Sequence, residues 1–127
     1  MISLTTTSVL IVDDSRTMRT VLREMLSRLG VRSIEEAASG EDAFALIRAK
    51  SFTLIISDFN MEGMDGLELL RQVRQVSRPG QNRTIFMTSE RSWSVQTSAR
   101  LEGAEAFITK PFTIDALKTK IEQVLQR

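Results

Sequence analysis

Polar residues that could do chemistry follow the apolar segments of this chain. Apolar runs of about five residues are typical of strands buried on both faces. In an α/β protein, ligands and chemistry are found at the carboxyl ends of such strands, which share one edge of the sheet. The residues concerned are Asp13 and Asp14 after the run 8–12, Asp58 after 54–57, Thr88 after 84–87, and Lys110 just past 106–108.

Together these side chains suit the handling of a phosphoryl group. Three carboxylates at one edge repel each other unless a cation compensates, and Mg²⁺ prefers carboxylate, carbonyl and water oxygens. The ammonium of Lys110 can hold a further anion, and the hydroxyl of Thr88 can donate a hydrogen bond to one. We therefore expect a carboxylate nucleophile, a metal ion that neutralises charge, and a cation for the transferred oxygens.

The composition excludes several other kinds of chemistry. The chain has no cysteine and no histidine, which excludes disulfides, thiolate nucleophiles and imidazole as a base, ligand or phosphate carrier. A formal net charge of +1 argues against a nucleic-acid binder held by bulk charge. No apolar run approaches the roughly 18 residues of a membrane span, and the N-terminus lacks the pattern of a secretion signal. With 127 residues, we expect one soluble, cytoplasmic domain without membrane insertion.

Strand and helix patterns alternate along the chain. Strands are expected at residues 8–12, 33–37, 54–57, 84–87 and 106–108. Helices are expected at residues 15–29, 39–50, 65–76 and 92–102, and from a Thr113 cap onward. The second strand carries Glu35 and Glu36, and this polarity suits an edge of the sheet. Such alternation predicts a mostly parallel sheet with helices on both faces, joined by right-handed crossovers.

Two helices carry more specific expectations. Apolar residues of the first recur at helical spacing and should face the core; they are Met18, Val21, Leu22, Met25 and Leu29. The fourth lacks such a stripe, because the positions three, four and seven residues after Trp93 are polar. Little apolar area is left to anchor it, so we expect it to be the most mobile helix before any modification, with Trp93 partly exposed.

Four short motifs occur in order at the expected strand ends. They are Val-Asp-Asp-Ser-Arg-Thr-Met-Arg (12–19), Ser-Asp-Phe-Asn-Met-Glu-Gly-Met-Asp-Gly (57–66), Phe-Met-Thr-Ser-Glu (86–90) and Phe-Ile-Thr-Lys-Pro-Phe (107–112). Each motif is weak alone, but all four in this order are highly specific. They resemble the response-regulator receiver family, and within it the single-domain chemotaxis regulators, over residues 8–126.

The resemblance implies a fold and a function. The fold would be flavodoxin-like: an α/β protein with a five-stranded parallel sheet in the order 2-1-3-4-5 and five helices on its two faces. One receiver domain would span residues 1–127, with no output domain because the chain ends soon after the last helix. The protein would be a signalling switch rather than an enzyme, catalysing only its own phosphotransfer and dephosphorylation. Its partners would be a histidine kinase or histidine phosphotransfer protein, and a target protein bound by the fourth helix, fifth strand and fifth helix.

The resemblance also assigns roles in phosphorylation and metal binding. Asp58 corresponds to the phosphoacceptor. Mg²⁺ would be bound by Asp58 itself and by three further residues. Of these, Asp14 corresponds to a direct ligand, Asp13 to a mostly water-mediated one, and Asn60 supplies its carbonyl oxygen.

Further residues correspond to the parts that hold and sense the phosphoryl group. Thr88 and Lys110 correspond to the residues that bind its oxygens, and the Lys110–Pro111 bond is usually cis in the family. Phe107 corresponds to an aromatic switch that turns inward when Thr88 moves toward the phosphate. Glu62 is a departure, because the family usually has proline there, and it predicts a more mobile and more acidic loop after the acceptor.

Other polar and sulfur-containing residues near the motifs have simpler interpretations. We interpret Arg16, Arg19 and Arg23 as a solvated face of the first helix rather than a ligand site. Met61 and Met64 are interpreted as packing residues rather than a binding surface.

Two other functions fit part of the pattern. A phosphohydrolase with an aspartyl-phosphate intermediate uses the same residue types, but has its nucleophile after the first strand and an acid two residues later. Here Asn60 stands two residues past Asp58. A receiver-shaped scaffold that is never phosphorylated should lack one or more of the site residues, and none is missing. Turnover of a generic phosphomonoester would distinguish the hydrolase from the switch.

Overall fold

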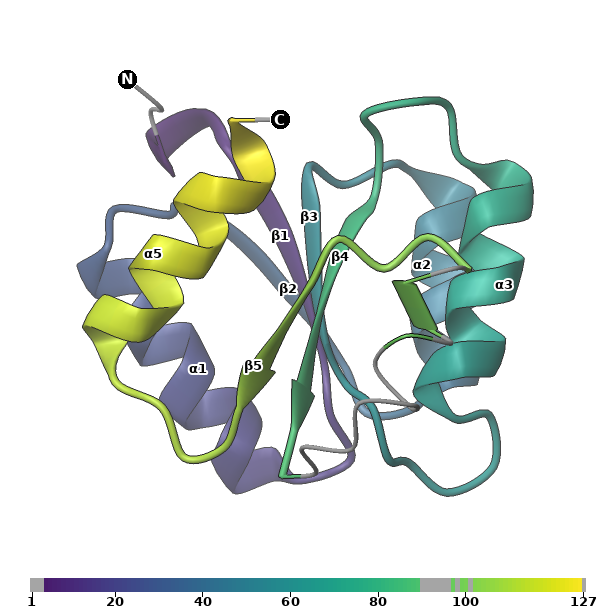
Figure 1. Cartoon of the computed structure of the whole chain (residues 1–127), viewed down its shortest axis with the longest axis horizontal. Coiled ribbons are helices and arrows are strands. Elements are labelled where there is room, and N and C mark those ends of the chain that lie inside the picture. Colours follow the sequence, from purple (N-terminus) through teal and green to yellow (C-terminus); the bar gives the residue numbers. More distant parts are fainter. Residues whose placement is uncertain (1–3, 90–96, 98, 101, 127) are drawn as a thin grey trace.

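The fold is built on one parallel sheet. The computed structural model describes residues 4–89, 97, 99–100 and 102–126. Its five strands are all parallel in the order β2-β1-β3-β4-β5, which confirms the expected topology. The strands are β1 (Ser8–Val12), β2 (Ser33–Ala37), β3 (Leu54–Asp58), β4 (Arg83–Thr88) and β5 (Ala106–Thr109). They run side by side through the middle of Figure 1, so their carboxyl ends lie at one end of the molecule.

Helices cover both faces of the sheet. The α-helices are α1 (Arg16–Arg28), α2 (Gly40–Ala49), α3 (Gly66–Val76) and α5 (Ile114–Leu125), and a short 3₁₀ helix, η1 (Leu4–Thr6), precedes β1. In Figure 1, α1 and α5 lie on one side of the sheet and α2 and α3 on the other. Each α-helix begins after a capping side chain that accepts a backbone N–H from three residues further on. The caps are Ser15, Ser39, Asp65 and Thr113, of which Thr113 was predicted from the sequence.

The core has two main layers because the central strands are buried on both sides. Val9 and Ile11 of β1 pack in the cluster that includes α1 and α5. Leu10 and Val12, which alternate with them, pack in the cluster that includes α2 and α3. Side chains of a strand point alternately to its two faces. The uninterrupted apolar runs in the sequence are therefore explained by burial on both faces.

The predicted core face of α1 is partly wrong. Leu22 is fully buried as expected, but Val21 is 43% exposed. Leu26, which was not among the predicted residues, is fully buried. Leu22 and Leu26 are four residues apart and so lie on one helix face, whereas Val21 is rotated by about 100° from Leu22. The apolar stripe in the sequence is therefore wider than the face that reaches the sheet.

The predicted fourth helix lies mostly outside the described residues. Thr97, Ala99 and Arg100 are helical, and Ala99 is fully buried. The start of the predicted helix, including Trp93, is not part of the described chain, so the mobility predicted for it stays a prediction. Within the described residues, four α-helices are complete, against five predicted.

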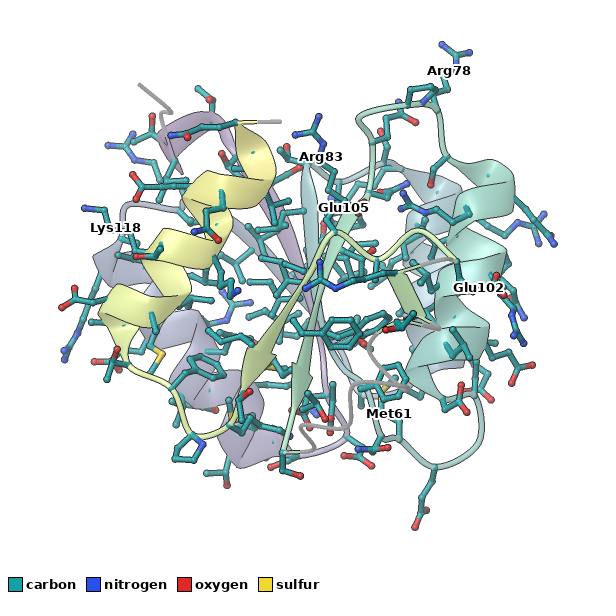
Figure 2. The ribbon with its side chains drawn as sticks, in the orientation of Figure 1. Met61, Arg78, Arg83, Glu102, Glu105 and Lys118 are labelled. Atoms are coloured by element: carbon teal, nitrogen blue, oxygen red, sulfur yellow. The ribbon has the colours of Figure 1, made fainter. Side chains whose placement is uncertain are left out.

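Charged side chains of α3 hold the segment that leads into β5. Arg71 Nε lies 3.3 Å from Glu102 Oε1, and Arg74 Nη1 lies 3.9 Å from Glu105 Oε1. Gly103 has a φ of +109°, a backbone conformation that residues with a side chain rarely adopt, which favours glycine in this turn. In Figure 2, Glu102 lies beside α3 and Glu105 lies where β5 begins. β5 then pairs with β4 in parallel, which places the carboxyl ends of the two strands side by side.

Within the described part of the chain, no helix has the length and apolar character needed to cross a membrane. The cytoplasmic location expected from the sequence stays a prediction.

Candidate functional site

The residues singled out in the sequence meet at one edge of the sheet. Asp58 is the last residue of β3 and Thr88 the last of β4. Asp13 and Asp14 directly follow β1, and Lys110 directly follows β5. Because all strands are parallel, these positions share the carboxyl edge, as predicted. The strand order reverses between β1 and β3, and this topological switch point is where ligands bind in open α/β sheets.

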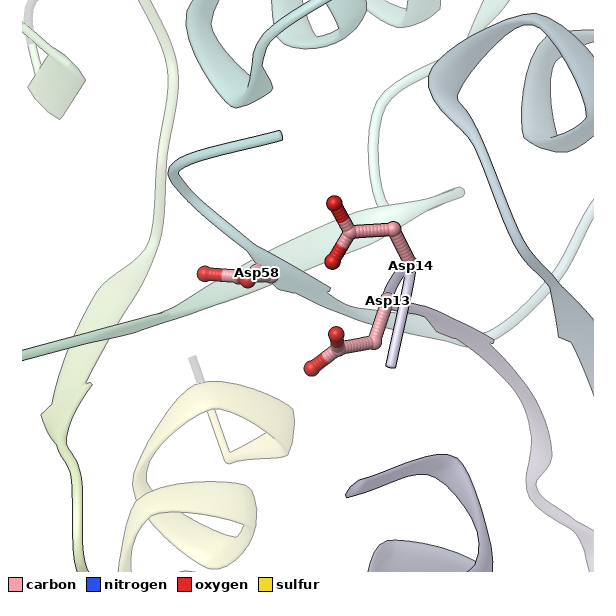
Figure 3. Close-up of side chains that lie close together, drawn as sticks. All are labelled: Asp13, Asp14 and Asp58. Carbon is pink, nitrogen blue, oxygen red and sulfur yellow. The ribbon is translucent and has the colours of Figure 1, made fainter. Parts of the chain in front are cut away.

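Three carboxylates form the centre of the site. Oxygen atoms of Asp13, Asp14 and Asp58 all lie within 4.8 Å of one another. Figure 3 shows the carboxylate groups of the three residues directed to the same side of the strand ends. Asp13 is 1% exposed and Asp58 is 7% exposed, whereas Asp14 is open to solvent. The cluster therefore presents one accessible and two buried acids to a ligand.

Asp13 has one carboxylate oxygen held and one free within the described structure. Its Oδ1 accepts the backbone N–H of Ser15 at 2.9 Å, while Oδ2 is buried without a hydrogen-bond partner in the described residues. Burial raises the pKa of Asp13, the Ser15 N–H lowers it, and the charge of Asp58 raises it again. A buried acceptor without a partner is costly. A hard divalent cation bound between these carboxylates would satisfy this oxygen and the shared negative charge.

Lys110 and Asn60 both contact the carboxylate of Asp58. Lys110 Nζ lies 3.3 Å from Asp58 Oδ1, and the backbone N–H of Asn60 donates to the same oxygen at 3.3 Å. The backbone N–H of Lys110 also donates to the carbonyl of Thr88 at 2.8 Å, which ties the turn after β5 to the end of β4. The Lys110–Pro111 peptide bond is cis, as expected from the resemblance. The chain thus brings a cation and a hydroxyl-bearing residue to the same edge as the acceptor carboxylate.

Phe107, expected to act as a switch, is enclosed in this structure. It is 5% exposed, and its ring centroid lies 5.9 Å from that of Phe59 and 5.7 Å from that of Phe86. Phe59 and Phe86 meet edge to face at 5.1 Å. A Cβ atom on Gly66 would lie 2.9 Å from both Phe59 Cα and Phe86 Cε1, so only glycine fits behind this cluster. The ring already occupies an inward position.

Two arginines of α1 form ion pairs with the edge strand of the sheet. Arg16 is exposed as expected and the Arg23 side chain is 43% exposed, but the interpretation of Arg19 as part of a solvated face is wrong, because its side chain is only 16% exposed. Nε of Arg19 lies 3.1 Å from Oε1 of Glu36, and Nε of Arg23 lies 2.6 Å from Oε2. Arg19 Nη1 also donates to the carbonyl oxygen of Asp13 at 2.8 Å. The two acids in the edge strand, Glu35 and Glu36, were the feature of the sequence that could have indicated these ion pairs, because Glu36 faces α1.

These observations define the class of protein: a doubly wound α/β domain with an acidic site and a lysine at its topological switch point. A family model described as the response regulator receiver domain matches residues 9–122. The chain belongs to that family, and it is a phosphorylatable response regulator.

Individual relatives agree with the family match. The chain is 35% identical over 119 residues to the chemotaxis protein CheY of Pseudomonas aeruginosa, covering 94% of this chain and 96% of the relative. It is 40% identical over 117 residues to the chemotaxis protein CheY1 of Helicobacter pylori, covering 91% and 94%. Among solved structures, the chemotaxis protein CheY4 of Vibrio cholerae matches with a TM-score of 0.87 and 33% identity, covering 94% of this chain and 98% of the other. The predicted kinship to single-domain chemotaxis regulators is confirmed.

Proposed function

We propose that Asp58 accepts a phosphoryl group from a phosphohistidine of a partner protein, with Mg²⁺ bound by the neighbouring acids. The observation that carries this proposal is the cluster of three carboxylates within 4.8 Å, with the Lys110 ammonium 3.3 Å from Asp58. Phosphoryl transfer depends mainly on positioning and on charge stabilisation, and this cluster supplies groups for both.

In the proposed reaction, a carboxylate oxygen of Asp58 attacks the phosphorus atom. The new O–P bond forms while the P–N bond to the donor imidazole breaks, and the imidazole leaves with the bond's electron pair. Asp13, Asp14, Asp58 and the Asn60 carbonyl would hold Mg²⁺, which would neutralise charge on the transferred oxygens. The Lys110 ammonium and the Thr88 hydroxyl would bind the remaining oxygens. Hydrolysis of the resulting acyl phosphate would return the protein to its resting state.

We further propose that phosphorylation changes which protein the domain binds, and that the pathway is chemotaxis or a related two-component system. The names of the relatives, chemotaxis proteins of three bacteria, support the pathway. The proposed docking face comprises the fourth helix, β5 and α5. Phe107 lies on β5 and Thr88 at the end of the neighbouring β4, and both are proposed to couple the site to that face.

The proposal is tested by labelling with acetyl phosphate and with phosphorylated histidine kinases of the host. The wild-type protein should be labelled in millimolar Mg²⁺ and should lose labelling in excess chelator. Asp58→Asn should not be labelled by either donor, because an acyl phosphate forms only on a carboxylate placed in line with the donor. Asp65→Asn, an acid of the same loop that caps α3, is the matched control and should be labelled as the wild type is. Full labelling of Asp58→Asn would show that the acceptor is another residue.

The phosphohydrolase alternative is not favoured by the geometry. Its nucleophile would follow the first strand, whereas Asp58 ends β3 and is followed two residues later by Asn60. An assay with a generic phosphomonoester tests this directly, and we expect no turnover above that of Asp58→Asn.

A further inference from the structure

Arg19 connects the acidic turn after β1 to the edge strand of the sheet. Its side chain is only 16% exposed, although it lies near the start of a surface helix. One nitrogen, Nη1, donates to the carbonyl oxygen of Asp13 at 2.8 Å, and another, Nε, donates to Oε1 of Glu36 at 3.1 Å. A guanidinium offers its donors in a rigid planar fork. Its contact with Glu36 therefore fixes the direction in which it meets the Asp13 carbonyl.

The carbonyl that Arg19 binds belongs to the peptide bond between the two adjacent acids. Because a peptide unit is planar, fixing this oxygen also fixes the direction in which the chain enters Asp14. The backbone N–H of Asp13 donates to the carbonyl of Ala37 at 3.1 Å, so β2 holds the other side of the residue. Oδ1 of Asp13 is held by the N–H of Ser15. Contacts from β2, from Ser15 and from Arg19 thus hold Asp13, while its Oδ2 is buried without a hydrogen-bond partner within the described residues.

Glu36 is itself held from a second direction. Nε of Arg23 donates to its Oε2 at 2.6 Å, and Nη2 of Arg23 donates to the carbonyl of Ile34 at 3.1 Å. Both oxygens of the Glu36 carboxylate therefore have charged donors from α1. Since β2 is an edge strand, these contacts attach α1 and the acidic turn to a strand that pairs only with β1.

We propose that Arg19, oriented by Glu36, is a positioning residue for the metal site: it holds the peptide between Asp13 and Asp14 so that both carboxylates face the bound cation. The inference rests on the proposed function in that the cation is Mg²⁺. It assigns Arg19 no contact with the metal or the phosphoryl group. Residues that orient metal ligands through hydrogen bonds typically change metal affinity by 10- to 100-fold when removed.

A positioning role and a purely electrostatic role of Arg19 predict opposite changes in Mg²⁺ affinity when Arg19 is replaced. Replacing Arg19 by glutamine removes a positive charge close to three acids, and by Coulomb's law alone this would strengthen Mg²⁺ binding. If Arg19 positions the turn, its loss instead weakens Mg²⁺ binding. In Glu36→Gln both effects weaken Mg²⁺ binding, and the lost negative charge does so only slightly. A loss of affinity close to that of Arg19→Gln would therefore come from the release of Arg19.

The experiment measures the Mg²⁺ dissociation constant of the unphosphorylated protein by calorimetry, together with urea unfolding. Arg19→Gln should weaken Mg²⁺ binding about tenfold. Arg19→Lys should also weaken it, because a single ammonium cannot reproduce the fork. Arg28→Gln is the matched control. It breaks an exposed ion pair of the same helix, in which Arg28 Nη2 lies 2.8 Å from Glu24 Oε1, and should leave the Mg²⁺ affinity unchanged.

A double variant, Arg19→Gln with Glu36→Gln, should weaken binding no more than Arg19→Gln alone, since both substitutions break one unit. Unchanged or tighter Mg²⁺ binding in Arg19→Gln would overturn the proposal, as would a loss of stability without a change in affinity. If Arg19→Gln does not fold, Arg19→Lys and Glu36→Gln decide by the same criterion. The Mg²⁺ measurements do not depend on which residue accepts the phosphoryl group. Labelling of Asp58→Asn would reject the proposed function, but the comparison of Mg²⁺ affinities would still test the role of Arg19.

Discussion

The ammonium of Lys110 lies 3.3 Å from Oδ1 of Asp58, across the end of β4 that separates their strands. Lys110 is held there by its own backbone, whose N–H donates to the carbonyl of Thr88 at 2.8 Å. The side chain is 28% exposed, so the ion pair is screened only in part by water. This cation compensates part of the charge of the three acids and would compete with a metal ion for them.

Lys110→Met should therefore change two properties in opposite directions. Mg²⁺ should bind more tightly, by roughly fivefold or about 1 kcal/mol, because a nearby unit charge no longer repels it. Labelling by acetyl phosphate should become slower, because the transferred oxygens lose a charged donor. Calorimetry and gel-based labelling measure the two effects. Lys118→Met, on the exposed surface of α5, should change neither, and equal labelling rates of Lys110→Met and the wild type would contradict the role given to Lys110.

Asp14→Ala should abolish labelling while leaving the protein folded. Asp14 is the exposed member of the cluster, so its removal costs little packing and relieves repulsion between like charges. A metal that binds only the folded state raises the melting temperature. Millimolar Mg²⁺ should therefore stabilise the wild type against heat but not Asp14→Ala. The control Asp42→Ala, an exposed acid in the first turn of α2, should behave as the wild type does. Wild-type labelling in excess chelator would argue against a metal-dependent site.

The acid sensitivity of the fold should depend on Glu36. A hydrogen bond from Arg23 is the largest effect and lowers the pKa of Glu36 below its ordinary value of 4.5. Burial, the second-largest effect, opposes it, and the charge of Arg23 and the hydrogen bond and charge of Arg19 lower the pKa further. A carboxylate whose pKa is lowered by folding stabilises the folded state above the unfolded pKa, and this stability is lost as the pH falls through the folded pKa.

Glu36→Gln should accordingly be less stable than the wild type at pH 7, by on the order of 1 kcal/mol. The difference should persist down to about pH 4.5 and vanish below it, as the wild-type carboxylate becomes protonated. Urea unfolding at a series of pH values measures this. Glu24→Gln, which breaks an exposed pair on α1, is the control and should show little change at any pH. A difference that grows on acidification would contradict the assignment.

Most of the fold and the site could be predicted from the sequence because their signals are local. Strands buried on both faces have uninterrupted apolar runs, and the residues that end those runs must share one edge in a parallel sheet. The strand order came from the resemblance, since periodicity does not specify which strands are neighbours. For this reason the sequence correctly predicted that the side chains of Asp13, Asp58 and Lys110 lie close together.

The errors concern contacts between segments far apart in the sequence. Arg19 and Glu36 are 17 residues apart, and no helical or strand period relates them. Their contact follows from the pairing of β1 with β2, which places Glu36 opposite Ile11, two residues before Asp13. Val21 was misplaced because its exposure depends on how α1 rotates against the sheet and α5, which an apolar stripe does not determine.

Phe107→Ala should lower stability strongly and leave the metal site intact. Its ring packs in a cluster with Phe86 and Leu70, on the side of the sheet that faces α3. Truncating an enclosed phenylalanine should cost roughly 3–4 kcal/mol. Mg²⁺ affinity should stay within about twofold of the wild type, because the ring packs against Phe59 and Phe86 and beneath the guanidinium of Arg100. Urea unfolding and calorimetry test both statements, with Val76→Ala, 47% exposed, as the control that should cost less than about 0.5 kcal/mol. A cost below about 1 kcal/mol for Phe107→Ala would mean that the ring spends most of its time outside the cluster in solution, in conflict with the enclosed position seen here.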